Sequence, residues 1–110
     1  MGRSGYLGEF EQVVLLALAR LGDEAYGMRI RLEIEARAGR AASIGAVYAT
    51  LDRLASKGYV RARDEDSGGR ARRFFLLTPQ GLAALESARD LQARMWSGLR
   101  IRLKGAGRKT

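Results

Sequence analysis

The side chains best suited to specific chemistry lie on one face of a predicted helix between residues 43 and 57. They either carry hydroxyl or cationic groups or are so small that this face can approach another surface closely. Such groups predict hydrogen bonding and ion pairing with whatever lies against them. An ordinary solvated helix face is the alternative on periodicity alone, so the neighbouring elements must decide. The face consists of Ser43, Gly45, Ala46, Ala49, Thr50, Arg53 and Lys57.

The opposite face of this helix predicts how it is held. Ser43 is a good N-cap, and Gly58 sits where a left-handed residue would end the helix. Tyr59 and Val60 then begin a run typical of a strand. Tyr48 belongs to the apolar stripe, although its hydroxyl could emerge to solvent. The stripe predicted to be buried is Ile44, Val47, Tyr48, Leu51, Leu54 and Ala55.

Composition argues against most enzymatic chemistry. The 110 residues include no cysteine and no histidine, which removes disulfides, thiolate nucleophiles, the usual zinc ligands and the neutral-pH proton shuttle. No set of nucleophile, base and orienting residue is visible. We therefore expect no enzyme, no metal site and no cofactor. The absence of a signal-peptide core or a membrane-length apolar run predicts a cytoplasmic protein.

Positive charge is concentrated in the second half of the chain. The net charge is +8; residues 1–55 hold seven basic and seven acidic side chains, whereas residues 56–110 hold thirteen basic and five acidic ones. A polyanion would therefore meet the second half first. This distribution is a weak indication of nucleic-acid binding when taken alone.

Two helices are expected before the central one. Residues 1–7 predict a loosely held arm, and residues 9–21 a helix apolar nearly all round, which would be buried on most sides and also touch a partner subunit. A second helix is expected over residues 26–38, closed by Gly39. Three helices joined by tight turns have the helix-turn-helix layout.

A β-hairpin is predicted after the third helix. Residues 59–63 and 70–77 form the expected strands, and residues 64–69 the expected turn. Three arginines, Arg70, Arg72 and Arg73, lie on or beside the tip, where they could reach DNA phosphates or a minor groove. Alternatively, they pair with Asp64, Glu65 and Asp66 and merely solvate the hairpin.

A final helix is expected from Thr78 and Pro79 to about Lys104. Its apolar stripe is too long to be covered by a three-helix core, which predicts packing on a second subunit. The residues assigned to this dimer contact are Leu85, Leu91, Met95, Trp96, Leu99 and Leu103. The fold expected from these elements is α+β and mostly α, with a winged helix-turn-helix domain over residues 1–78 and a dimerisation helix with a basic tail over residues 79–110.

The chain resembles the PadR family of transcriptional regulators, specifically the short subfamily with a single C-terminal helix. The resemblance covers about residues 6–103. It is carried by Tyr26-Gly27, by residues 43–51 with Arg53-Leu54, by residues 57–60, by Gly69-Arg70, and by residues 75–78 with Gly81. One departure is Ala49, where many relatives have proline.

The resemblance implies a homodimeric repressor whose third helices enter successive major grooves of a pseudo-palindromic DNA operator. Residues of the small, polar face and Tyr48 would meet the DNA, with Arg53 toward the bases and Lys57 and the three hairpin arginines toward phosphates. Some short members bind flat aromatic or cationic compounds at the dimer interface, which would place such an effector beside Trp96, Met95 and Leu99. The alternative for Trp96 is plain dimer packing, and Asp90 is the nearest acid that could pair with a cationic compound.

Two other classes of function compete with an operator-specific regulator. A nonspecific architectural DNA-binding protein fits the charge equally well and would bind any duplex with a steep salt dependence. A winged-helix module that binds another protein would need an exposed apolar patch on the third helix, and the sequence predicts none there.

Overall fold

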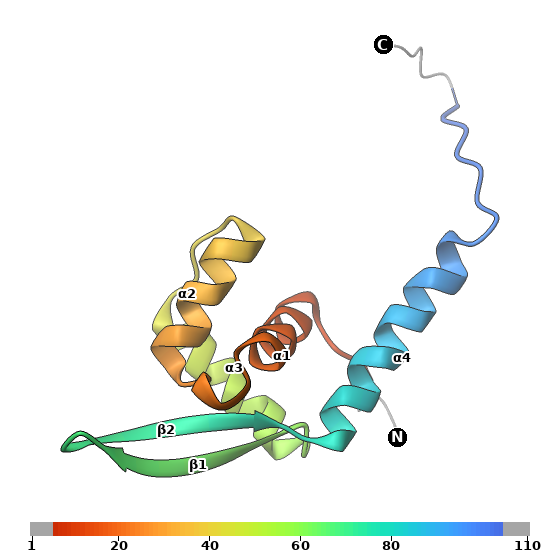
Figure 1. Ribbon diagram of the computed structural model, residues 1–110. Helices are drawn as coiled ribbons and strands as arrows, with labels where there is room; N and C mark the ends of the chain where they lie inside the picture. Colours follow the sequence, from red (N-terminus) through yellow and green to blue (C-terminus); the bar gives the residue numbers. More distant parts are fainter. Residues whose placement is uncertain (1–5, 105–110) are drawn as a thin grey trace.

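The computed structural model describes residues 6–104, except the side chain of Ser67, and folds as a winged helix (Figure 1). Three helices precede a two-stranded antiparallel hairpin, and a fourth helix follows it. The predicted arm and the end of the basic tail lie outside these residues. The elements are α1 Glu9–Leu21, the short 3-10 helix η2 Gly22–Glu24, α2 Gly27–Ala38, α3 Ile44–Ser56, β1 Val60–Ser67, β2 Arg70–Leu77 and α4 Pro79–Trp96.

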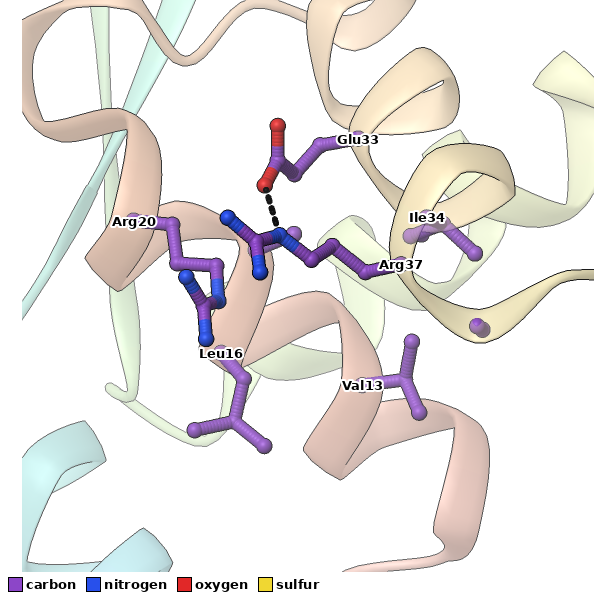
Figure 2. Close-up of a pocket in the computed structure, with 8 residues that line it drawn as sticks. Val13, Leu16, Arg20, Glu33, Ile34 and Arg37 are labelled. Atoms are coloured by element: carbon purple, nitrogen blue, oxygen red, sulfur yellow. Dashed lines mark hydrogen bonds and ion pairs between the residues drawn. The ribbon is translucent and has the colours of Figure 1, made fainter.

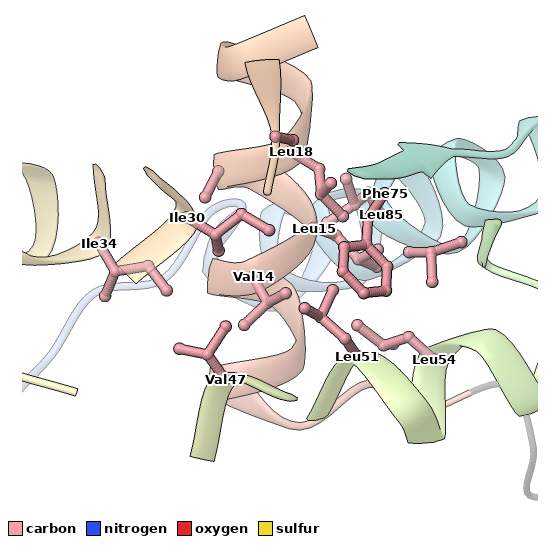
Figure 3. Packing of buried hydrophobic residues seen from close by; sticks show 13 residues of the cluster. Val14, Leu15, Leu18, Ile30, Ile34, Val47, Leu51, Leu54, Phe75 and Leu85 are labelled. Carbon is pink, nitrogen blue, oxygen red and sulfur yellow. The ribbon is translucent and has the colours of Figure 1, made fainter. Parts of the chain in front are cut away.

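Helix α1 is the centre of the core and contacts α2, α3, α4 and β2. Its buried residue Val14 faces Val47 of α3, and Leu15 lies close to Phe75 of β2 and Leu85 of α4 (Figure 3). Each fully buried aliphatic side chain of this kind contributes roughly 1.5–3 kcal/mol relative to an exposed one. The helix therefore fixes the relative positions of all the other elements.

Side-chain caps begin α3 and α4 as the sequence predicted. The Ala46 N–H donates to Ser43 Oγ at 3.0 Å, and the Gly81 N–H donates to Thr78 Oγ1 at 3.0 Å. The Thr78 hydroxyl also donates to the Gly58 carbonyl at 2.6 Å. The end of α3 and the start of α4 are thus joined through a single threonine.

Two glycines allow close contacts that no other residue would permit. A Cβ at Gly81 would overlap the carbonyl oxygen of Tyr59, and one at Gly27 would overlap the ring of Tyr48. Larger residues at either position would force the packed elements apart. Gly27 therefore lets the first turn of α2 rest on the ring of Tyr48 in α3.

The hairpin differs from its prediction in the length of its first strand. β1 runs from Val60 to Ser67, so the acidic residues 64–66 lie in the strand and not in the turn. The reason is cross-strand pairing: Asp64 lies opposite Arg73 and Glu65 opposite Arg72. The turn is only Gly68-Gly69, both with positive φ (59° and 77°), the combination that tight hairpin turns require.

A short segment before α2 extends the sheet. Tyr26 forms an isolated antiparallel bridge with Phe74, and the Phe75 N–H donates to the Ala25 carbonyl at 2.8 Å. Tyr26 is therefore extended and caps α2, which begins at Gly27, one residue later than predicted. This bridge attaches the base of the hairpin to the three-helix body.

Helix α4 is shorter than predicted, because it ends at Trp96 and not near Lys104. Gly98 has a φ of 71°, which a continuing right-handed helix cannot accommodate. Leu99 and Leu103 consequently lie beyond the helix, and both are exposed. The prediction that Leu85 contacts a second subunit is also wrong, since its side chain is buried in the core of its own chain.

The buried face of α3 differs from the predicted one. Two residues near the helix ends are exposed, and one in the middle is buried. Ile44 is 37% exposed and Ala55 is exposed, although both were expected inside. Thr50 was expected on the outer face but is only 2% exposed. Val47, Leu51 and Leu54 are fully buried, as predicted.

In the part of the chain described here, residues 6–104, no helix is both long enough and apolar enough to cross a membrane.

Candidate nucleic-acid interface

The outer face of α3 keeps the small residues that the sequence placed there. Ser43, Gly45, Ala46 and Ala49 are all exposed. A Cβ at Gly45 would meet only Ser43 Oγ, at 4.0 Å, so the space over this face is open. The backbone of α3 can therefore approach another surface closely.

Thr50 supports this face from beneath and does not belong to it. Its buried Oγ1 accepts a hydrogen bond from Arg53 Nη2 at 3.1 Å. The Arg53 side chain is 57% exposed, so one part of its guanidinium is held by Thr50 and another part is open to solvent. The predicted contact of Thr50 with bases is wrong, because its side chain is buried and its oxygen accepts from Arg53.

Tyr48 projects from α3 onto the start of α2. It is 41% exposed, its ring lies 6.3 Å from the ring of Phe75, and its hydroxyl end packs against Gly27. The aromatic body is therefore partly covered. The contact of its hydroxyl with a phosphate stays a prediction.

A carboxylate of α1 holds both cations of α3. Lys57 Nζ lies 3.2 and 3.4 Å from the two oxygens of Glu11, and Arg53 Nε lies 3.7 Å from Oε2. The Gly8 N–H also donates to Glu11 Oε1 at 2.9 Å. The predicted DNA contacts of Arg53 and Lys57 stay predictions, but in this structure both cations are bound to the same acid.

The environment of Glu11 lowers its pKa below the usual 4.5. Burial acts to raise the pKa, but the Gly8 N–H, Lys57 and Arg53 together favour the charged form more strongly. Sequence reasoning did not identify Glu11 or the exposed Asp52 as parts of this surface. No sequence signal marks the contact with Lys57, because 46 positions separate the two residues.

The hairpin arginines have different environments. Arg73 pairs with Asp64 (Nε to Oδ1, 2.8 Å), a pair that raises the pKa of Arg73 and lowers that of Asp64. The Arg72 guanidinium lies over the ring of Tyr26, 4.3 Å from its centroid. Arg70 follows the Gly68-Gly69 turn, is exposed, and makes no ion pair within the described residues.

Of the three predicted hairpin arginines, one pairs with the acidic residues 64–66, as the second alternative predicted. Mutual pairing holds for Arg73 and Asp64, whereas Glu65 pairs with Arg63 at 3.5 Å within the same strand. In residues 6–104, Asp66 has no ion pair. Arg70 is therefore the predicted hairpin arginine that is most available to an external phosphate.

Exposed apolar side chains gather at the end of α4. Leu91 is 42% exposed, Met95 70% and Trp96 61%. Trp96 Nε1 donates to Gln92 Oε1 at 3.3 Å, one turn earlier, so the indole lies along its own helix. Three large apolar residues near one helix end are more than a solvent-exposed surface normally carries.

A second apolar surface is a groove of about 390 Å³ between α1 and α2. The sequence predicted apolar surface on α1 that a partner would cover, but not a groove shared with α2. Leu16 of α1, 51% exposed, contributes to this groove. Figure 2 shows Arg37 paired with Glu33, one turn earlier on α2, at 3.3 Å, with Arg20 of α1 nearby. The lining consists of Val13, Leu16, Ala17, Arg20, Glu33, Ile34, Arg37 and Ala38.

Comparison with known proteins identifies a family and a fold. Residues 14–87 match the sequence profile of the family described as "Transcriptional regulator PadR-like family". No curated protein matches the chain in sequence.

Solved structures similar to this chain include three regulators or DNA-binding proteins. A PadR family transcription regulator from Clostridium difficile R20291 has 24% identity over 80% of this chain and 90% of its own, with a TM-score of 0.68. A PadR-like transcription factor from Bacteroides fragilis has 22% identity over 84% and 85%, with a TM-score of 0.70. The winged-helix DNA-binding protein F93 from STIV has 22% identity over 86% and 99%, with a TM-score of 0.64.

The contacts of Glu11 predict a pH-dependent contribution to stability. Because the folded state lowers the pKa of Glu11, its contribution is present above pH 4.5 and is lost as the pH falls through the lower folded value. Glu11→Gln should therefore reduce the free energy of unfolding by about 1–3 kcal/mol at pH 7, with a smaller difference at pH 3.5. Urea unfolding at both pH values measures this, with Glu9→Gln as control. A difference that does not change with pH would contradict it.

Proposed function

Because the chain belongs to the PadR-like family of transcriptional regulators, we propose that it is a homodimeric repressor that binds a specific DNA operator. In this proposal the α3 helices of two subunits enter successive major grooves of a pseudo-palindromic site. The observation that carries it is the outer face of α3: small exposed residues on a firmly capped helix, with the Arg53 guanidinium held at its edge. Such a role implies a cytoplasmic location, where the chromosome lies.

Direct recognition of bases would depend on few side chains. Gly45, Ala46 and Ala49 allow close approach but have no polar side-chain atoms, so Ser43 supplies the only short polar group among these four. Its Oγ accepts the helix-capping bond, and its O–H stays available to donate. Arg53 is the long donor of this face, and a bidentate arginine contact to guanine is the commonest specific contact in the major groove. DNA shape would supply part of the remaining specificity.

Contacts with the DNA backbone would fix the orientation of the protein. Arg70 at the hairpin tip is suited to this role, because it is exposed and no carboxylate in the described residues pairs with it. Tyr48, which projects from α3 onto the start of α2, could donate its hydroxyl to a phosphate. Arg73 and Arg72 would have to leave Asp64 and Tyr26 before contributing.

The dimer would be built from the two exposed apolar surfaces. The end of α4, with Leu91, Met95 and Trp96, would pack on the groove between α1 and α2 of the partner subunit, where Leu16 is half exposed. Burying both surfaces would remove a substantial apolar area from water. Leu99 and Leu103, beyond the helix, would extend this contact.

A small aromatic effector could then act at the same interface. Trp96 presents a large exposed ring, and Met95 and Leu99 beside it are also exposed, which suits stacking of a planar compound. Binding there would change the angle between the two α3 helices and release the operator.

The primary test compares DNA affinities. Fluorescence anisotropy would measure binding of the purified protein to the intergenic DNA upstream of its own gene and to a scrambled duplex, at low and physiological salt. We expect at least a thousandfold preference that survives the rise in salt. Equal affinities that vanish with salt would instead favour a nonspecific architectural DNA-binding protein.

Replacement of Arg53 tests its role in base recognition. Arg53→Ala should weaken operator binding by about 5- to 100-fold, the range expected for a lost bidentate base contact, and weaken scrambled-duplex binding far less. Arg29→Ala removes an exposed arginine of α2 and serves as the charge-matched control. Equal losses on the two duplexes would show that Arg53 does not recognise bases.

Replacement of Trp96 tests the interface. Trp96→Ala should raise the dimer dissociation constant at least tenfold, since buried aromatic anchors dominate interface energies, and should abolish the response of operator binding to planar aromatic compounds. Sedimentation velocity and the anisotropy assay measure these effects, with Glu86→Ala on the same helix as control. An unchanged dimer dissociation constant would exclude Trp96 from the interface, and an unchanged response to planar compounds would exclude it from effector binding.

A further inference from the structure

Glu11 occupies an unusual position for a residue outside the proposed DNA-contacting surface. It belongs to the first turn of α1, yet its carboxylate contacts Arg53 and Lys57 at the C-terminal end of α3. The Glu11 side chain is only 11% exposed, whereas Arg53 is 57% and Lys57 30% exposed. The acid thus holds both cations from the protein side while they still reach solvent.

Both cations at the end of α3 already have a carboxylate partner within the protein. Arg53 and Lys57 are the basic residues of the segment from Ser43 to Gly58, and both are bound to Glu11. A single carboxylate therefore offsets part of the positive charge that these two cations would otherwise present to a phosphate backbone.

Nonspecific DNA binding depends on cations that are able to neutralise phosphates. Lys57 carries a compact charge on a flexible stem and would bind a phosphate of any sequence if Glu11 did not hold it. Arg53 is held by Thr50 and Glu11 together, which directs its remaining N–H groups to solvent in a defined orientation. Both restraints favour recognition of bases over attachment to the DNA backbone.

We propose that Glu11 is a specificity-determining positioning residue, which withholds Lys57 from phosphates and orients Arg53. The inference rests on the proposed function in one respect, since it assigns Arg53 to base contacts. Glu11 itself does not touch DNA. It acts by keeping nonspecific affinity low and by limiting the conformations available to Arg53. Both effects raise the ratio of operator affinity to nonspecific DNA affinity.

The test is the salt dependence of binding for Glu11→Gln. Releasing Lys57 and Arg53 should steepen the slope of log affinity against log salt on a scrambled duplex by about 0.9 for each new phosphate contact. Scrambled-duplex affinity near 0.1 M salt should rise by about 3- to 10-fold and operator preference should fall. Glu86→Gln on α4 removes the same charge from an exposed carboxylate that pairs with no cation in residues 6–104, and should leave both slopes unchanged.

Three further variants separate positioning from general loss of structure. Glu11→Asp keeps the carboxylate and should restore most of the operator preference. The double variant with Glu11→Gln and Lys57→Gln should return the scrambled-duplex slope toward that of the wild type. Lys57→Gln alone should change that slope much less than the 0.9 expected for a lost phosphate contact. Circular dichroism verifies that each protein is folded at the assay temperature.

The outcomes distinguish this inference from the proposed function. Glu11→Gln with a scrambled-duplex slope equal to that of Glu86→Gln would overturn it, as would a loss of about 0.9 in the slope for Lys57→Gln alone. Absence of an operator preference in the wild type would overturn the proposed function instead. In that case the scrambled-duplex slopes still decide whether Glu11 withholds Lys57.

Discussion

Burial of α1 is the constraint on which the rest of this structure depends. Its residues Val14, Leu15, Ala17 and Leu18 are nearly inaccessible to solvent, and they contact elements from every later part of the chain. A helix buried on so many sides leaves little freedom in where α2, α3, β2 and α4 can lie. The orientation of the exposed face of α3 therefore follows from the packing of its opposite face on α1.

Close contacts at two glycines also fix the positions of α2 and α4. Tyr48 can lie against α2 because Gly27 has no side chain, and α4 can begin against Tyr59 because Gly81 has none. The hydroxyl of Thr78 then links the start of α4 to the end of α3. The start of α4 is thus fixed directly against the segment after α3 that carries Lys57.

The sequence predicted correctly those features that depend on neighbouring residues. Helices α1 to α3, the caps at Ser43 and Thr78 and the left-handed Gly39 all follow from patterns within a few positions. The sequence-based predictions were wrong where contacts between distant residues, or a single residue that interrupts a helix, determine the length of an element. β1 is long because Asp64 meets Arg73, and α4 ends early because Gly98 interrupts a stripe that the apolar spacing continued through Leu99 and Leu103.

The candidate site was only partly predictable for the same reason. Periodicity placed Ser43, Gly45, Ala46 and Ala49 on the exposed face correctly, because all four lie well away from the buried stripe. Thr50 lies at the border of that stripe, where periodicity cannot decide between a base contact and a buried support.

The pairing of charges around α3 changes how the net charge of +8 should be interpreted. Several cations of the proposed DNA-binding surface are already paired within the protein: Arg53 and Lys57 share Glu11, and Arg73 pairs with Asp64. The described basic residues after α4, Arg100, Arg102 and Lys104, are exposed and lie in the segment that Gly98 separates from the helix. Overall charge is thus a poor guide to affinity here, because most of the excess lies away from α3. A surface of this kind is suited to selecting among sequences, since its cations must exchange a protein carboxylate for a phosphate and gain little from DNA of arbitrary sequence.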